Sequence, residues 1–295
     1  MLPIIDTHQH LWDLNKFRLP WTDTVPALAR SYLTNDYLEA TAGLNVVKAI
    51  YMEVDVDPAQ QTAEADAIIE LCQRDDNPTV AAVISGRPAD AEGFETYISR
   101  FKGSPYIKGV RQVLHGPGAP AGYCLQPSFV RSVQLLGEMG MSFDLCLRPG
   151  ELSDAVKLVD QCPETQFILD HCGNANFYIV AGVDQPADGK PHTRQQWMDD
   201  IRALAARPNV ACKISGIIAS ARPDNWTAND LAPTINHCLD AFGPDRVVFG
   251  GDWPVCTLGA PYAAWANALK IVIMNRSEDE QRKLLHDNAA RIYRV

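Results

Sequence analysis

The sequence predicts an α/β fold, a single distorted (β/α)8 barrel of the TIM type that spans residues 1–295. Eight short β-rich runs recur along the whole chain, helical patterns lie between them, and no change in composition marks a domain boundary. A length of 295 residues suits one such barrel, which typically has about 250 residues. The alternative is an open, doubly wound sheet. It lacks its glycine-rich phosphate loop here, because Gly116–Gly122 contains prolines.

The expected strands are mostly continuous apolar runs, as in parallel strands that are buried on both faces. The eight runs are Ile4–Thr7, Val46–Val54, Val80–Ser85, Ile107–Val113, Met141–Leu147, Phe167–Asp170, Val210–Ser215 and Val247–Gly250.

The expected helices carry apolar residues at helical spacing. A last helix is expected after Ser277, because Ser277 and Glu280 form a capping pattern. Stretches rich in Pro, Gly and Asp follow predicted strands and are expected to be long loops over the active face. The helices are Pro58–Arg74, Phe129–Met139, Leu152–Cys162, Gln195–Ala206 and Leu231–Phe242, and the loops are Arg87–Gly93, Gly116–Gly122 and Asp184–Pro191.

The composition, 46% hydrophobic and 21% charged, is that of a soluble globular protein. The chain has no apolar run of about 18 residues and no signal-peptide pattern at its start, so we expect a cytoplasmic protein. Its net charge of −10 argues against nucleic acid or an anionic membrane as a partner. The eight cysteines show no C-x-x-C spacing and are expected to be free, buried thiols.

Ionisable residues stand at the ends of most predicted strands, where a (β/α)8 barrel has its active site. A core needs none of these groups, and burying an unpaired charge is costly. Their shared placement therefore predicts a functional site. The residues are His8, His10, Glu53, Arg111, Arg148, His171, Lys213 and Asp252.

His8 and His10 form an H-x-H pair at the end of the first strand. Residues two apart on a strand point to the same face, so both imidazoles can reach one ion. Imidazole is a common zinc ligand, and we predict a site of His8, His10 and Asp252 with Glu53 as a candidate fourth ligand. Two alternatives remain: the histidines only form hydrogen bonds inside the barrel, and Glu53 pairs with an arginine.

Asp252 follows two glycines and precedes Trp253 and Pro254. Its carboxylate can accept a proton from an attacking water, bind a metal ion, or do both. His171 can polarise a carbonyl group or hold the water. The plainer alternatives are a loop-capping aspartate and a structural histidine.

Several segments together resemble the amidohydrolase superfamily, over essentially the full length of the chain. They are closest to its branch of lactone hydrolases, which includes L-fuconolactonase, L-rhamnonolactonase and 2-pyrone-4,6-dicarboxylate lactonase. The segments are IDTHQHLWD (residues 5–13), KGVR (108–111), FDLC (143–146), LDHCG (169–173), CKISG (212–216) and FGGDWPV (249–255).

This resemblance implies an amidohydrolase-like barrel that hydrolyses a cyclic ester. His8 and His10 would be the strand-one pair, His171 the strand-six histidine and Asp252 the general base. The resemblance also implies a sugar-derived substrate, an aldonolactone such as L-fucono- or L-rhamnonolactone, which is opened to the hydroxy acid.

The sequence departs from the superfamily at two metal-ligand positions. Arg111 stands where a bridging lysine ends strand four, and strand five ends at Arg148 without a histidine. We therefore expect one divalent ion at most, with zinc favoured, and leave open whether turnover needs it. Gly251 also stands where relatives often have a serine.

The expected mechanism has Asp252 activate a water while the histidines stabilise the oxyanion. The tryptophans are equally explained as packing residues, and Lys213 as a partner of Asp170. The residues expected to contact the substrate are Arg111, Arg148, Trp12, Trp253, Lys213 and His192.

Other functions are weighed against a lactonase. A serine hydrolase is excluded because G-x-S-x-G is absent. A metal-dependent decarboxylase, a hydrolase of a non-sugar carboxylic lactone and a barrel that only binds its ligand remain. A small molecule is the expected partner, and a homo-oligomer is compatible with the sequence.

Overall fold

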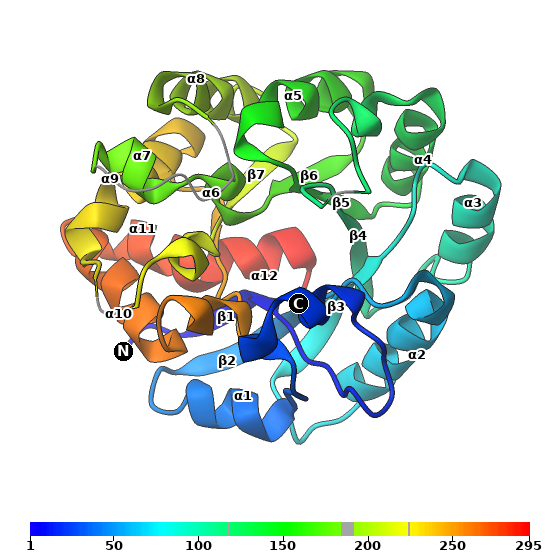
Figure 1. Cartoon of the computed structure of the whole chain (residues 1–295), viewed down its shortest axis with the longest axis horizontal. Helices are drawn as coiled ribbons and strands as arrows, with labels where there is room; N and C mark the ends of the chain where they lie inside the picture. The colour runs from blue at the N-terminus through cyan, green and yellow to red at the C-terminus, as the bar shows by residue number, and fades with distance from the viewer. Residues whose placement is uncertain (117, 184–191, 224) are drawn as a thin grey trace.

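The computed structural model describes residues 1–116, 118–183, 192–223 and 225–295. It contains one parallel sheet of eight strands in the order β1 to β8, with helices around it (Figure 1), so the barrel prediction is confirmed. The strands are β1 Ile4–Gln9, β2 Val46–Met52, β3 Thr79–Ser85, β4 Ile107–Val113, β5 Ser142–Cys146, β6 Gln166–Leu169, β7 Val210–Ile214 and β8 Val247–Phe249.

The barrel closes between β1 and the segment that follows the short strand β8. Gln9 forms an isolated parallel bridge with Trp253. The amide of Asp252 donates to the carbonyl of His8 at 2.8 Å, and the amide of His10 donates to the carbonyl of Trp253 at 2.8 Å. This closing seam is therefore built from the segments that carry the predicted metal ligands.

The expected helices are present, each within a few residues of its predicted bounds. Ser277 accepts a hydrogen bond from the amide of Glu280, which confirms the capping pattern. These helices are α2 Gln61–Cys72, α4 Pro127–Glu138, α5 Leu152–Gln161, α8 Arg194–Ala205, α9 Ala228–Phe242 and α11 Glu278–Arg282.

Further helices were not predicted. The loop expected at Arg87–Gly93 is wrong in its second half, because Asp90 caps a helix that begins at Ala91. The loop expected at Asp184–Pro191 lies outside the described residues. The unpredicted helices are α1 Thr34–Ala40, α3 Ala91–Ser99, α6 His171–Asn174, α7 Phe177–Ala181, α10 Tyr262–Val272 and α12 Asn288–Tyr293.

One end of the barrel is filled by α12, which crosses behind the strands in Figure 1. Its Ala289 and Tyr293 are buried against apolar side chains of the barrel interior. This packing leaves the carboxyl ends of the strands to the polar residues. The interior side chains are Ile5, Ile50, Met52, Ala81, Val83 and Val248.

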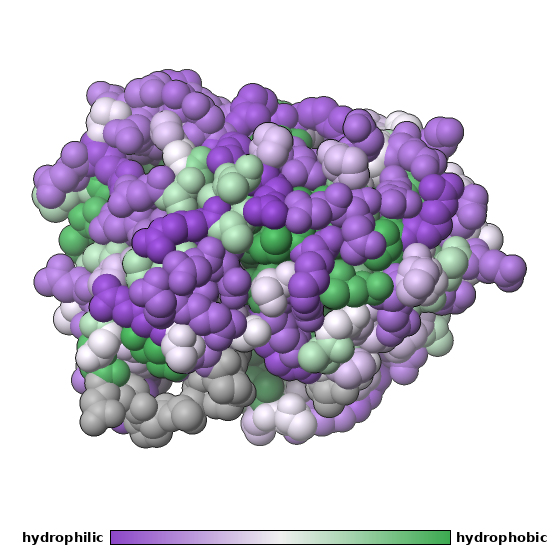
Figure 2. Space-filling view, turned by 90° about the horizontal axis from the view of Figure 1, so that it is seen from above, coloured by the Kyte–Doolittle hydropathy of each residue, from purple (hydrophilic) through white to green (hydrophobic). Residues whose placement is uncertain are grey.

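The outside of the barrel is largely polar. On the face shown in Figure 2, hydrophilic residues predominate and apolar residues show in small groups between them. No helix among the described residues is long and apolar enough to cross a membrane. All eight cysteines are buried free thiols, as the sequence predicted.

Candidate active site

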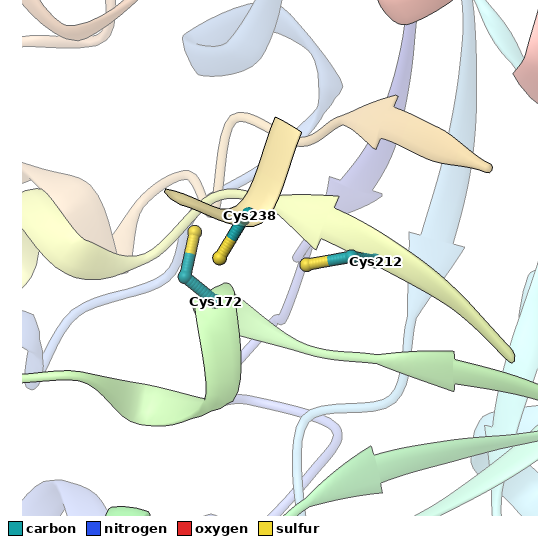
Figure 3. A group of neighbouring side chains, drawn as sticks. All are labelled: Cys172, Cys212 and Cys238. Carbon is teal, nitrogen blue, oxygen red and sulfur yellow. The ribbon is translucent and has the colours of Figure 1, made fainter. Parts of the chain in front are cut away.

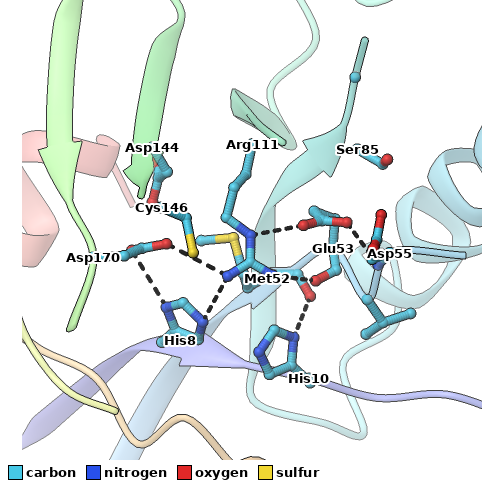
Figure 4. Close-up of polar contacts among 12 residues, drawn as sticks. His8, His10, Met52, Glu53, Asp55, Ser85, Arg111, Asp144, Cys146 and Asp170 are labelled. Carbon is cyan, nitrogen blue, oxygen red and sulfur yellow. Dashed lines mark hydrogen bonds and ion pairs between the residues drawn. The ribbon is translucent and has the colours of Figure 1, made fainter. Parts of the chain in front are cut away.

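The structure brings most of the predicted polar residues together at the carboxyl ends of the strands, and Figure 4 shows His8, His10, Glu53 and Arg111 among them. The ring of His8 lies 4.8 Å from that of His10 and 4.4 Å from that of His171, measured between centroids. His8 comes from β1, Arg111 from β4 and Lys213 from β7. Three histidines and their neighbours therefore form one cluster, although they are far apart in the sequence.

Asp252 faces two of these imidazoles. One of its carboxylate oxygens, Oδ1, lies 3.6 Å from Nε2 of His8 and 3.5 Å from Nε2 of His10. Asp252 keeps 3% of its surface exposed, His10 5% and His171 8%, whereas His8 is fully buried. Asp252, His10 and His171 thus keep a small contact with solvent, and His8 has none.

A layer of buried ion pairs, formed by Lys213 and Arg111 with carboxylates, contacts the ring of His8. The fully buried Lys213 places Nζ 2.8 Å from a carboxylate oxygen of Asp144 and 2.8 Å from one of Asp170. The same Nζ lies 3.2 Å from Nδ1 of His8. The ammonium group of Lys213 is therefore paired with two carboxylates inside the barrel.

Arg111 forms the second part of this layer. Its Nε donates to Oε1 of Glu53 at 2.7 Å, and its Nη2 donates to the Glu53 carbonyl at 2.8 Å. Its Nη1 lies 3.2 Å from Nε2 of His8 and 3.4 Å from Asp170. The pairing of Glu53 with an arginine, one of the alternatives from the sequence, is thus present.

These surroundings set the protonation of the cluster. Burial and the neighbouring Lys213 hold the pKa of His8 well below its usual value, so this imidazole is neutral. Burial also lowers the pKa of His171, although the nearby Asp252 opposes this. Burial raises the pKa of Asp144 to about 7 against the opposing effect of Lys213. The imidazoles of His8 and His171 are therefore held toward the neutral form.

Asp6 connects β1 to the segment that carries Asp252. Its Oδ1 accepts from the amides of His8 at 3.0 Å and Gly251 at 2.7 Å. Its Oδ2 accepts from the hydroxyls of Tyr37 at 2.8 Å and Tyr262 at 3.0 Å. This carboxylate fixes the backbone on both sides of the closing seam.

The glycine at position 251 now has a physical reason. A Cβ atom there would overlap the ring of Tyr262 and lie 2.6 Å from Oδ2 of Asp6. A serine in place of Gly251 would require both side chains to move. Gly216 is similarly constrained, because a Cβ atom would overlap the ring of His171 and the backbone there has a φ of +68°.

The predicted metal ligands fit one divalent ion. His8, His10 and Asp252 each offer one ligand atom, and these atoms lie within 4.8 Å of one another. An ion on Nε2 of His8 would replace the contact of that atom with Nη1 of Arg111, which lies 3.2 Å away. Nδ1 of His10 donates to the carbonyl of Met52 at 2.9 Å, which leaves its Nε2 free as a ligand. The separations of 3.5 and 3.6 Å resemble those between ligands about 2.0–2.2 Å from a tetrahedral zinc.

Glu53 does not join this group. Oε1 pairs with Arg111, and Oε2 accepts from the amide of Asp55 at 2.7 Å. Both carboxylate oxygens of Glu53 therefore already have hydrogen-bond partners. The fit is thus to three protein ligands and one ion.

Four of the predicted substrate contacts lie outside the polar cluster. Trp12 is buried and donates from Nε1 to the carbonyl of Arg30. The ring of Trp253 packs edge to face against Tyr32 and Tyr37. Both tryptophans thus pack as core aromatic residues.

The other two, Arg148 and His192, form hydrogen bonds with backbone groups of loops. Arg148 donates to the carbonyls of Gly116 and Ala119 and pairs with Glu151. His192 accepts from the amide of Asn176 at 3.1 Å. Neither interaction reaches the three histidines.

The sequence analysis gave no role to several residues that the structure places in the cluster. Asp6 and Asp144 are fully buried acids, and Ser215 Oγ lies 2.9 Å from Nδ1 of His171. The available signal was a charged residue inside an apolar run, as in Phe143-Asp144-Leu145. Such a residue needs a buried partner.

Comparisons with known proteins show the family of the chain. A model of the family described as amidohydrolase matches residues 5–295. An uncharacterized protein of Sinorhizobium fredii, y4mH, is 30% identical over all of this chain and 99% of its own. An L-fucono-1,5-lactonase of Burkholderia multivorans is 28% identical over 98% of this chain and 95% of its own.

A solved structure shows the same architecture with a metal. It is a crystal structure of an amidohydrolase from Burkholderia multivorans with bound zinc, which is 27% identical. It covers 99% of each chain with a TM-score of 0.82. On the full-length family match and these relatives, the chain belongs to the amidohydrolase family.

Proposed function

We propose that this chain hydrolyses a sugar-derived lactone, an aldonolactone, to the open hydroxy acid. Asp252 carries this proposal, because it is a carboxylate with 3% of its surface exposed that faces imidazoles at the carboxyl ends of the strands. The lactonase from Burkholderia multivorans supports the substrate class. So does an L-rhamnono-gamma-lactonase of Scheffersomyces stipitis, 23% identical over 99% of this chain.

Asp252 and His10 position the attacking water. Because Nδ1 of His10 donates to Met52, its Nε2 accepts a hydrogen bond, as does Oδ1 of Asp252, 3.5 Å away. A water between them is held by both of its protons, with a lone pair free for the carbonyl carbon. Asp252 takes one proton as the new C–O bond forms.

His171 is the candidate donor to the oxyanion. When the hydroxyl of Ser215 donates to Nδ1, the neutral ring carries its proton on Nε2, where it can donate to the carbonyl oxygen. A divalent ion held by His8, His10 and Asp252 would occupy these same acceptor atoms in place of the bridging water and would supply Lewis acidity to the site. The ring C–O bond then breaks, and Asp252 returns its proton to the leaving alkoxide.

A lactone screen tests this function. Purified chain is offered aldonolactones of fucose, rhamnose and other sugars in weakly buffered pH indicator, because ring opening releases acid. We expect turnover of at least one aldonolactone above the rate of spontaneous opening, and loss of it in Asp252→Asn. The screen is repeated after chelation and after addition of zinc. Failure to open any aldonolactone in either metal state contradicts the proposal.

A further inference from the structure

Three cysteines, one of which directly follows His171 in the chain, form a buried cluster. Cys172 lies on α6, Cys212 on β7 and Cys238 on α9, and all three are fully buried. Their sulfur atoms lie within 4.8 Å of one another. Figure 3 shows the three side chains extending from these elements into a shared space.

The cluster offers only soft ligands. Among the described residues, the group holds three sulfur atoms without an imidazole or a carboxylate. Structural zinc sites almost always use four ligands, so this set is incomplete for zinc. Thiolate sulfur selects soft ions such as Cu⁺, for which three sulfur ligands form a complete trigonal site.

Binding of Cu⁺ would displace thiol protons from the cluster, because the thiolate is the form of cysteine that ligates a metal. In the structure the thiol of Cys172 donates to the carbonyl of Lys213 at 3.9 Å. Copper uptake should therefore release protons and be stronger at higher pH.

We propose that Cys172, Cys212 and Cys238 bind one Cu⁺ ion through three sulfur atoms. Packing as small apolar side chains explains the burial of the cysteines but does not require three sulfurs from separate elements to converge. The site lies next to the catalytic cluster, because His171 and Cys172 are consecutive residues. Both adopt left-handed backbone conformations, with φ of 55° and 53°. The proposal is independent of the lactone substrate.

Competition with a chelator tests copper binding. Reduced full-length chain is titrated anaerobically with Cu⁺ supplied as its bicinchoninate complex. Because the site is buried, a second sample is refolded with the same complex. We expect one Cu⁺ per chain that resists the chelator, and an X-ray absorption shell of three sulfur atoms. Cys212→Ala and Cys238→Ala should each weaken binding by at least about tenfold, since each removes one ligand.

Two controls define the site. Cys162→Ala removes a buried thiol outside the cluster, and His10→Ala removes a ligand of the histidine site, so both should bind Cu⁺ as the parent chain does. Circular dichroism establishes that each variant is folded. If an alanine variant does not fold, the absorption shell of the parent chain decides. A shell with nitrogen or oxygen, unchanged binding in folded cluster variants, or no chelator-resistant copper overturns the proposal.

Discussion

Asp252 differs from the other acids of the site in keeping a small exposed fraction of 3%. Asp6, Glu53, Asp144 and Asp170 are fully buried, and each accepts a hydrogen bond or faces a cation. Asp252 contacts the imidazoles of His8 and His10 instead. A carboxylate that is not tied up in an ion pair is free to accept and return a proton, which is what a general base does.

Replacing this carboxylate tests its role. We expect Asp252→Asn to lower kcat by at least about 10²-fold, because the amide cannot accept the proton of the water. Steady-state kinetics measures the effect, and circular dichroism establishes that the barrel persists. Near-normal turnover in the folded variant would remove Asp252 from the mechanism.

The ligand set limits the zinc content. We expect at most one equivalent of zinc per chain at the histidine site, and its loss in His10→Ala, because three donor groups support a single ion. Elemental analysis after dialysis against zinc measures both. Cys238→Ala serves as the control that leaves these three ligands intact. Two zinc equivalents in that control contradict the expectation.

The cluster of His8, His10, His171 and Asp252 could be predicted from their places at the ends of predicted strands, because the carboxyl ends of parallel strands meet at one edge. The sequence could not show in which direction a long side chain extends or how far it reaches. Arg148 follows β5 yet turns toward the loop at Gly116. The substrate contacts expected of Arg148 and the tryptophans stay predictions that no observation here tests.

At the scale of elements, Glu64 on α2 carries a pH dependence. Burial raises its pKa to about 8, against a usual 4.5. Its Oε1 accepts from Tyr51 and from the amide of Val54, whereas Oε2 has no partner among the described residues. The folded chain keeps a proton that the unfolded chain releases above pH 4.5. The stability that this proton provides is therefore lost as pH rises from 4.5 through about 8.

Glu64→Gln should remove this dependence, because the amide stays neutral at every pH. Relative to the variant, the parent chain should lose about 1.4 kcal/mol of unfolding free energy per pH unit between roughly pH 5 and pH 8. Urea unfolding at several pH values measures the difference. Parallel curves for the two chains would show that Glu64 is already ionised in the folded state.

The closing seam predicts a steric effect. Gly251→Ser should lower the unfolding free energy by about 1–3 kcal/mol, because the new atoms overlap Tyr262. Gly116→Ser is the matched control, since a Cβ atom there meets nothing within 4 Å. Chemical denaturation compares them, and equal stabilities would mean that Tyr262 moves aside without cost.

The strands were predictable because buried parallel strands are continuous apolar runs. Some helices were not. In α1, Thr34–Ala40, only Tyr37 is buried, so periodicity is weak. The helix α10, Tyr262–Val272, is rich in apolar residues on every side, which hides its buried face. The helix α3 begins inside a stretch whose Pro, Gly and Asp residues indicate a loop.

At the scale of the whole molecule, α12 completes the core of the barrel. Tyr293 is 1% exposed among the interior side chains of several strands. Tyr293→Ala should therefore cost about 3–5 kcal/mol of unfolding free energy, the usual cost of emptying a buried aromatic site. Calorimetry measures it against Met274→Ala, whose side chain is 65% exposed. A similar Tm for the two variants would mean that the barrel does not depend on α12.

The hydrogen bonds of Asp6 make the rate at which the closing seam opens measurable. Its carboxylate holds the amides of His8 and Gly251, one on each side of the junction, while Asp252 donates its own amide to His8. Opening the junction would release these amide protons to solvent and displace Asp252 in the same event. Deuterium uptake at these amides and the onset of thermal inactivation should therefore follow one rate, so an isotope-exchange measurement can report how long the enzyme stays competent without any substrate.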